Sequence, residues 1–228
     1  MRGRAGLAAM LLVLLAVGCD DDGPVPDPAG DLALIEGAAA GRVDEVERLL
    51  EEGANVATTD ATGRTALVAA AYGNHVDVVE RLIEAGADVD VEDDSQQSAF
   101  LIATSEVGDD PRLLELTLAN GADVRSLDSY NGTGLIRAAD RGFTAIVARL
   151  LETDIEVDHV NRLEWTALLE AIILGDGGHD HVETVRLIVE AGADVNIADN
   201  EGVTPLEHAE QAGYDEIGVI LVAAGAAR

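Results

Sequence analysis

Apolar residues recur at helical spacing in the stretch 181–191, and the unit that contains them is repeated along the chain. Val182, Val185, Ile188 and Val189 are related by steps of three and four residues, so they share one face of a helix. The pattern predicts an amphipathic helix over 182–191. Gly192 follows the last apolar position, where a glycine can adopt the left-handed backbone that ends a helix.

A second helix is expected one turn later. Residues 193–202 are rich in Asn, Asp and Gly, which is typical of a tight turn. Thr204 can accept the N-cap hydrogen bond, Pro205 suits the first helical position, and Glu207 is placed to complete a capping box. The unit is therefore a helix, a short hairpin loop and a second helix.

The same unit recurs with a period of 33 to 38 residues. The turn that ends the second helix of each copy is marked by Gly53, Gly86, Gly121, Asp154, Gly192 and Gly225. A helix pair of this size cannot bury its apolar face alone, so the copies should stack into a solenoid. Asn74, between two helices, and Asp154 stand where glycine is expected, and both residue types tolerate a left-handed backbone.

Short phrases in these copies resemble the ankyrin repeat family. They are "TAL" at 65–67 and 166–168, "TPL" at 204–206, "EAGAD" at 84–88 and 190–194, and "NGAD" at 120–123. The resemblance covers residues 31–225 and implies an all-α ankyrin-repeat solenoid of about six helix-turn-helix repeats with short hairpin loops. It also implies a non-enzymatic protein that binds partner proteins through a concave surface.

The composition narrows the class of partner. The chain has 44 acidic and 14 basic residues, which gives a formal net charge of −30. Phosphate binding needs a basic surface, so no nucleic acid is expected as a partner. The acidic excess has two interpretations, a solvated surface that serves solubility and a preference for a basic partner protein.

Residues 1–18 differ from all that follows. Arg2 and Arg4 precede an apolar run over 5–17, which is shorter than the roughly 18 residues of a transmembrane helix. This order is typical of an export signal peptide. The segment 16–19 resembles the lipobox of bacterial lipoproteins, which implies lipidation of Cys19. An ordinary cleaved signal with an incidental cysteine is one alternative, and a membrane span is another.

Residues 19–30 link the lipidated cysteine to the repeats. They are rich in Asp, Pro and Gly, and such a segment is expected to be a flexible tether. The repeat domain is assigned to 31–228. These segments together predict an exported, monomeric protein that is held in the cell envelope by an N-terminal lipid and faces the periplasm.

No residue pattern indicates catalysis or a bound cofactor. The chain lacks a nucleophile elbow, a Walker loop and a dinucleotide-binding glycine pattern. His75 is expected to pack or to form hydrogen bonds. The one candidate metal cluster is Asp176, His179, Asp180 and His181, in the insertion between the helices of the fifth copy. Adjacent residues in a glycine-rich loop do not converge on one ion, so a solvated loop without metal is expected.

The residues predicted to bind a partner are those that the resemblance places on the hairpins and on the exposed side of each first helix. They are Arg64, Tyr72, Gln97, Tyr130, Arg141, Arg162, Leu163, Trp165 and Leu174. Tyr130, Arg141, Arg162, Leu163 and Trp165 form the central cluster, because Trp, Tyr and Arg dominate binding hot spots. The alternative for Trp165 is packing over its own hairpin.

Three functions are compatible with the sequence. The first is an envelope-anchored scaffold that binds an unidentified protein, with an inhibitor or immunity-like antagonist as a special case. The second is a metal-dependent enzyme that uses the 176–181 loop. The third is a passive structural spacer. The fold resemblance favours the scaffold, although ankyrin folds host many unrelated roles.

Overall fold

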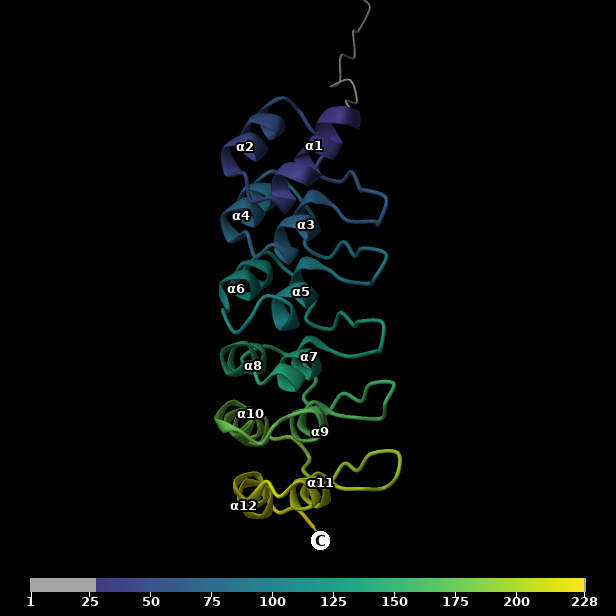
Figure 1. Cartoon of the computed structure of the whole chain (residues 1–228), viewed down its shortest axis with the longest axis vertical. Helices are drawn as coiled ribbons and strands as arrows, with labels where there is room; N and C mark the ends of the chain where they lie inside the picture. The colour runs from purple at the N-terminus through teal and green to yellow at the C-terminus, as the bar shows by residue number, and fades with distance from the viewer. Residues whose placement is uncertain (1–27, 228) are drawn as a thin grey trace, which may run out of the picture.

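The computed structural model describes residues 28–227, in which twelve α-helices form six stacked pairs (Figure 1). The predicted all-α solenoid is confirmed, and the described range contains no β-structure beyond one isolated bridge between Leu127 and Thr133. The predicted signal peptide, Cys19 and most of the predicted tether lie outside the described residues. None of the helices in 28–227 combines the length and apolar character needed to cross a membrane.

Each repeat contributes one helix to an inner stack and one to an outer stack. The first helices are α1 Pro28–Ala39, α3 Ala66–Tyr72, α5 Ala99–Ser105, α7 Gly134–Arg141, α9 Ala167–Ile173 and α11 Pro205–Ala212. The second helices are α2 Val43–Glu51, α4 Val76–Glu84, α6 Arg112–Ala119, α8 Thr144–Leu151, α10 His179–Glu190 and α12 Asp215–Ala223. Successive first helices pack against one another from α1 to α11, and the hairpins project beside them (Figure 1).

The first helix starts earlier than predicted. α1 begins at Pro28, so the last three residues of the predicted tether are helical. Proline suits the first turn of a helix because no amide hydrogen is needed there. Asp31 then holds α1 to the following hairpin, since its carboxylate accepts the Asn55 amide at 2.7 Å and the Thr58 hydroxyl at 3.0 Å.

A hydroxyl residue caps five of the six first helices. The side chains of Thr65, Ser98, Thr133, Thr166 and Thr204 each accept the backbone N–H three residues later. Thr204 and Glu207 form the predicted capping box. Each cap contributes about 1 kcal/mol to stability, and together they set where every hairpin ends.

The turns after the second helices follow the prediction at the glycines but not at Asp154. Gly53, Gly86, Gly121, Gly192 and Gly225 have φ between 88° and 95°, and Asn74 has φ of 51°. Asp154 is absent from the described residues with positive φ, so its predicted left-handed backbone is wrong. The Thr153 hydroxyl donates to the Leu150 carbonyl at 2.6 Å and accepts from the Ile155 amide. This side chain completes the turn without a left-handed residue.

The core is built from small and aliphatic side chains between the stacked helices. Leu34, Leu67, Phe100, Leu135 and Leu168 are almost completely buried in successive first helices. Leu187 on the outer stack is only half-buried, although it packs against the same core. The C-terminal helix is less covered, and Val219 remains 69% exposed.

Polar side chains also tie one repeat to the next. The His75 ring nitrogen Nε2 lies 3.2 Å from the Ala39 carbonyl, so the expected hydrogen-bonding role of this residue is confirmed. The Tyr214 hydroxyl donates to the Gly175 carbonyl at 2.8 Å. Asp109 accepts the amides of Ala145 and Ile146 and thereby caps α8, which has no capping side chain of its own.

Candidate binding site

Five hairpins share one polar residue that shapes them. An aspartate or asparagine stands five residues before each helix cap, at Asp60, Asp93, Asp128, Asn161 and Asp199. In every case the Oδ1 atom accepts two backbone N–H groups of the same hairpin. The hairpins are therefore held in one conformation, and the second side-chain atom of this residue is left for another partner.

That second atom pairs with the first helix in the last three hairpins. The Oδ2 atom of Asp128 lies 2.9 Å from Arg137 Nη1, and that of Asp199 lies 2.8 Å from His208 Nε2. The partner is nine residues further along in both repeats. Repeat five keeps the spacing and reverses the polarity, because the Asn161 amide Nδ2 donates to Glu170 Oε1 at 2.7 Å.

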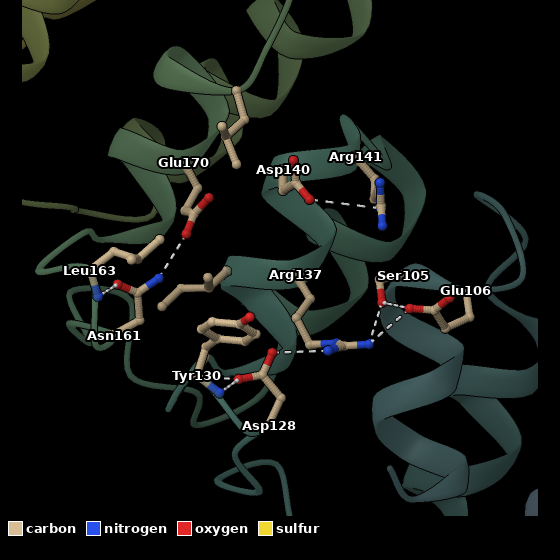
Figure 2. A pocket seen from close by; sticks show the side chains of 13 residues that line it. Ser105, Glu106, Asp128, Tyr130, Arg137, Asp140, Arg141, Asn161, Leu163 and Glu170 are labelled. Carbon is tan, nitrogen blue, oxygen red and sulfur yellow. Dashed lines mark hydrogen bonds and ion pairs between the residues drawn. The ribbon is translucent and has the colours of Figure 1, made fainter. Parts of the chain in front are cut away.

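A pocket of about 330 Å³ lies where repeats four and five meet (Figure 2). Its lining comes from the ends of α5, α7 and α9 and from the hairpins before α7 and α9. The residues are Ser105, Glu106, Asp128, Tyr130, Gly132, Ile136, Arg137, Asp140, Arg141, Asn161, Leu163, Glu170 and Leu174. The pocket thus combines exposed apolar side chains with four carboxyl groups and two guanidinium groups.

Glu170 is the most buried acidic residue of this lining. It is 5% exposed, and within residues 28–227 its carboxyl group accepts a hydrogen bond only from Asn161. The pKa of Glu170 is raised from 4.5 to about 7, mainly by burial. The Asn161 hydrogen bond lowers it in part, and the nearby carboxylates of Asp140 and Asp128 contribute to raising it. A carboxyl group with a pKa near neutrality in a pocket is a feature of functional sites.

Arg137 also lines the pocket, and both of its terminal nitrogens form hydrogen bonds. Its Nη1 atom binds Asp128, and its Nη2 atom contacts Gln97 at 2.9 Å, Ser105 at 2.6 Å and Glu106 at 3.1 Å. The side chain is 13% exposed, and its buried Nε atom has no hydrogen-bond partner among the described residues. Arg137 therefore joins repeat three to repeat four.

The structure brings four of the predicted contact residues together around this pocket. Tyr130, Arg141, Leu163 and Leu174 line it, and Figure 2 shows Tyr130 and Leu163 near Asn161. Trp165 does not line it and is half-buried beside its hairpin, where its amide donates to Asn161. Whether the Trp165 side chain contacts a partner stays a prediction.

The remaining predicted residues are placed elsewhere. Arg162 reaches back to the Ser129 carbonyl in the previous hairpin. Arg64 and Tyr72 line a separate surface pocket, where the Tyr72 hydroxyl donates to Asp93 at 2.9 Å. Burial, together with the Asp93 hydrogen bond, raises the pKa of Tyr72 to about 12. Gln97 was predicted to contact a partner from the surface, but its side chain is buried and accepts a hydrogen bond from Arg137.

The insertion in repeat five was predicted to be a loop, but its last residues are helical. α10 begins at His179, after Gly178 at the cap, so the three residues 179–181 form its first turn. The His181 ring joins Asp176 at 3.0 Å to the Asp140 carbonyl at 3.1 Å. Residues 28–227 contain no group of three or more His, Cys, Asp or Glu side chains arranged for a metal ion.

Glu170, Asn161 and Arg137 were not predicted as site residues. The available signal was the comparison of repeats, since Asn161 replaces the aspartate of four other hairpins and an acid stands nine residues later. In repeats four and six the same nine-residue spacing joins an aspartate to a basic residue. The replacement of both residues in repeat five therefore indicates a pair in which donor and acceptor are exchanged.

Comparisons with known proteins agree with this architecture. The family model described as ankyrin repeats in three copies matches residues 4–93 and 100–199. The ankyrin repeat protein YahD of Escherichia coli (strain K12) is 41% identical over 128 residues, which cover 56% of this chain and 63% of YahD. The match thus spans less than two thirds of that relative.

Two solved structures are similar over most of the chain. An ankyrin repeat domain from Acinetobacter baumannii AYE has 42% identity and a TM-score of 0.80, and the match covers 86% of this chain and 98% of that domain. The ankyrin repeat protein EF0377 has 32% identity and a TM-score of 0.78, with coverage of 84% and 97%.

Proposed function

The chain belongs to the ankyrin repeat family, and from this premise we propose that it is an envelope-anchored scaffold that binds a partner protein. Ankyrin repeats form protein–protein interaction domains, and nothing in the described residues points to an enzyme. The binding surface is the hairpin face, by which we mean the five hairpins and the exposed sides of the first helices. An inhibitor or immunity-like antagonist is the special case in which the bound partner loses its activity.

The distribution of exposed apolar residues carries this proposal. Among residues 28–227, the large apolar side chains that remain exposed are Leu32, Tyr72, Tyr130, Val160, Leu163, Leu174, Val219 and Val222. All but the last two lie on the hairpins or first helices, and the second helices before α12 have none. Exposed apolar side chains that gather on one face mark an interaction surface.

The pocket between repeats four and five is the centre of this surface. Tyr130 is 62% exposed, Leu174 52% and Leu163 43%, and all three line it. An aromatic and two aliphatic side chains around a concavity are suited to anchor residues of a partner. The Asx turns of the hairpins hold these side chains in place before binding, which lowers the entropic cost of association.

Photo-crosslinking tests the proposed surface. A photoreactive amino acid is placed at Leu163 or Leu174, with an exposed position on the outer stack, Glu190, as the matched control. The same partner should be crosslinked in intact cells from both hairpin-face positions and not from Glu190. Equal crosslinking at Glu190 would contradict the surface, and no crosslinked partner at any position would favour a passive spacer.

Trp165→Ala separates the two interpretations of Trp165. If the indole contacts the partner, the variant should bind the crosslinked protein more weakly by about 2 kcal/mol while its melting temperature hardly changes. A large fall in melting temperature with unchanged affinity would identify Trp165 as a packing residue.

The envelope location rests on the first 19 residues. The basic start, the apolar run and Gly18-Cys19 support export followed by lipidation of Cys19. Cys19→Ser should move the protein from the membrane fraction to the soluble periplasm and abolish labelling by a radioactive fatty acid. If the variant still sediments with membranes and still carries the label, the lipid anchor is wrong.

A further inference from the structure

The carboxyl group of Glu170 is buried and only half paired. Asn161 donates to Oε1, and the described residues provide no hydrogen-bond donor to Oε2. Oε2 keeps some contact with solvent, since the described polar side-chain atoms that are both fully buried and unpaired are Arg137 Nε and Thr184 Oγ1. Glu170 lines the pocket (Figure 2). This oxygen is therefore open to the pocket, on a side chain that is 95% buried.

The charges around Glu170 do not neutralise it. Asp128, Asp140 and Glu106 also line the pocket, against Arg137 and Arg141. Arg137 is held by Asp128 and Glu106, and Arg141 Nε lies 3.7 Å from Asp140. With both guanidinium groups directed to other carboxylates, Glu170 has no cationic partner among residues 28–227.

The rest of the pocket suits a long side chain with an apolar stem. Tyr130, Leu163 and Leu174 provide exposed apolar surface in the lining, whereas Glu170 is buried. Lysine and arginine pack their methylene groups on apolar surface while the charged end binds elsewhere. An aromatic ring in the lining also attracts a cation through its π-face.

We propose that the pocket between repeats four and five receives a lysine or arginine side chain of the partner protein, whose charged end pairs with Glu170. This inference rests on the proposed function, because it names the chemistry of the partner residue that the hairpin face binds. The net charge of −30 acts in the same direction, since it attracts a basic partner before contact. The alternative is that an apolar side chain of the partner occupies the same pocket, and the peptide titration distinguishes the two.

The charge state of Glu170 provides a readout that a general acidic surface would not give. Binding of a cation requires the ionised form, so affinity should increase as the pH rises through about 7, the pKa of Glu170. The groups that line the pocket with it are Asp140, Arg137 and Arg141 of α7 and Asp128 and Asn161 of the hairpins. The helix α11, which packs against α9, carries His208, and this side chain is paired with Asp199. Affinity at pH 8 should exceed that at pH 6 by about tenfold, which follows from the fraction of ionised Glu170 at each pH.

The test uses three tripeptide probes, acetyl-Gly-Arg-Gly-amide, the lysine analogue and the citrulline analogue, titrated into the folded repeat protein and followed by NMR. Citrulline has the shape of arginine without the charge. We expect the arginine or lysine probe to bind at least tenfold more tightly than citrulline, with shift changes at Asn161 and Leu163. Equal binding of all three probes, or shift changes remote from the pocket, would overturn the proposal.

Glu170→Gln is the decisive variant, because glutamine keeps the acceptor for Asn161 and removes the charge. It should bind the basic probes at least tenfold more weakly and lose the pH dependence. Glu190→Gln removes one carboxylate from the outer stack and controls for net charge, so it should bind as the parent does. If Glu170→Gln binds the probes unchanged while crosslinking from Leu163 still captures the partner, the basic anchor is wrong and the proposed function stands.

Discussion

Repeats four and five use the same hairpin backbone and the same nine-residue spacing for opposite polar pairs. Asp128 accepts from Arg137 in repeat four, and Asn161 donates to Glu170 in repeat five. The difference shows which part of the hairpin residue is structural. Its Oδ1 atom is needed for the turn in both repeats, whereas the second atom can be an acceptor or a donor.

The two helix residues also differ in how completely they are used. Arg137 contacts four side chains from repeats three and four, so its role is to join them. Glu170 has one hydrogen bond and faces a pocket. Arg137 is thus occupied by contacts that stabilise the fold, whereas the Glu170 carboxyl group is available to a ligand.

The largest effect is expected from Arg137→Ala. The change leaves Asp128 and Gln97 without their charged partner in a mostly buried network, which typically costs about 3–5 kcal/mol. Urea-induced unfolding measures the loss. Arg149→Ala, which removes an ion pair of a helix surface, should cost less than about 1 kcal/mol. A loss below about 1 kcal/mol for Arg137→Ala would show that repeats three and four do not depend on this side chain.

The next effect is a gain, from Glu170→Gln at alkaline pH. The folded protein holds the pKa of Glu170 at about 7 against an ordinary value of 4.5, so ionisation opposes folding. The stability that Glu170 provides is complete below pH 4.5 and is lost as the pH rises through about 7. At pH 8 the glutamine variant should be more stable than the parent by up to about 3 kcal/mol.

Urea unfolding of parent and variant at pH 5 and pH 8 measures this difference. The variant should be more stable than the parent by less than about 1 kcal/mol at pH 5. Glu190→Gln should change stability by less than about 0.5 kcal/mol at both pH values. A constant difference between the two pH values would mean that Glu170 is not held with a raised pKa.

Asn161→Asp makes repeat five resemble repeat four at the hairpin and should destabilise it. The new carboxylate keeps the Oδ1 contacts but replaces the donor to Glu170 with a like charge, at a cost of about 2 kcal/mol at pH 8. The double variant Asn161→Asp with Glu170→Arg recreates the pair of repeat four and should recover most of the loss. Failure of the double variant to recover stability would show that the two sites are not coupled as a pair.

The smallest effect concerns the hairpin tip. Glu164 has φ of 61°, and the same position in repeat four is Asn131 with φ of 60°. Asparagine tolerates this backbone better than glutamate does, so Glu164→Asn should stabilise the protein by about 1 kcal/mol. A rise in melting temperature measures it, and a fall would mean that the Glu164 side chain makes a compensating contact.

The parts of the fold that could be predicted depend on neighbours in the sequence. Thr204 as a cap, Glu207 in the capping box and Gly192 in the turn each act within one turn of a helix. Asp154 shows the limit of this reasoning, since α8 ends at Leu151 and Thr153, one residue before Asp154, stands where Gly53 follows α2. A residue type indicates which conformations are tolerated, and the local hydrogen bonds decide which one is used.

The candidate site was less predictable because its chemistry depends on contacts between repeats. Tyr130 and Leu163 could be placed on the correct surface from their position in the repeat. Glu170 resembles an ordinary acid of an amphipathic helix until the packing of α7 and α11 against α9 buries it. Sequence spacing gives no measure of that burial, so its altered pKa could not be predicted.

Asp109 has a consequence for how the array comes apart. It belongs to repeat three, yet its carboxylate caps α8 of repeat four. In a linear array unfolding can begin at either end, and how easily the terminal repeat unfolds depends on the strength of its contact with the neighbouring repeat. This crosswise cap strengthens the junction between repeats three and four, so opening that starts at the C-terminus should slow there. Amide hydrogens of α8 should exchange with solvent more slowly than those of α12, and neutralising Asp109 should narrow that gap.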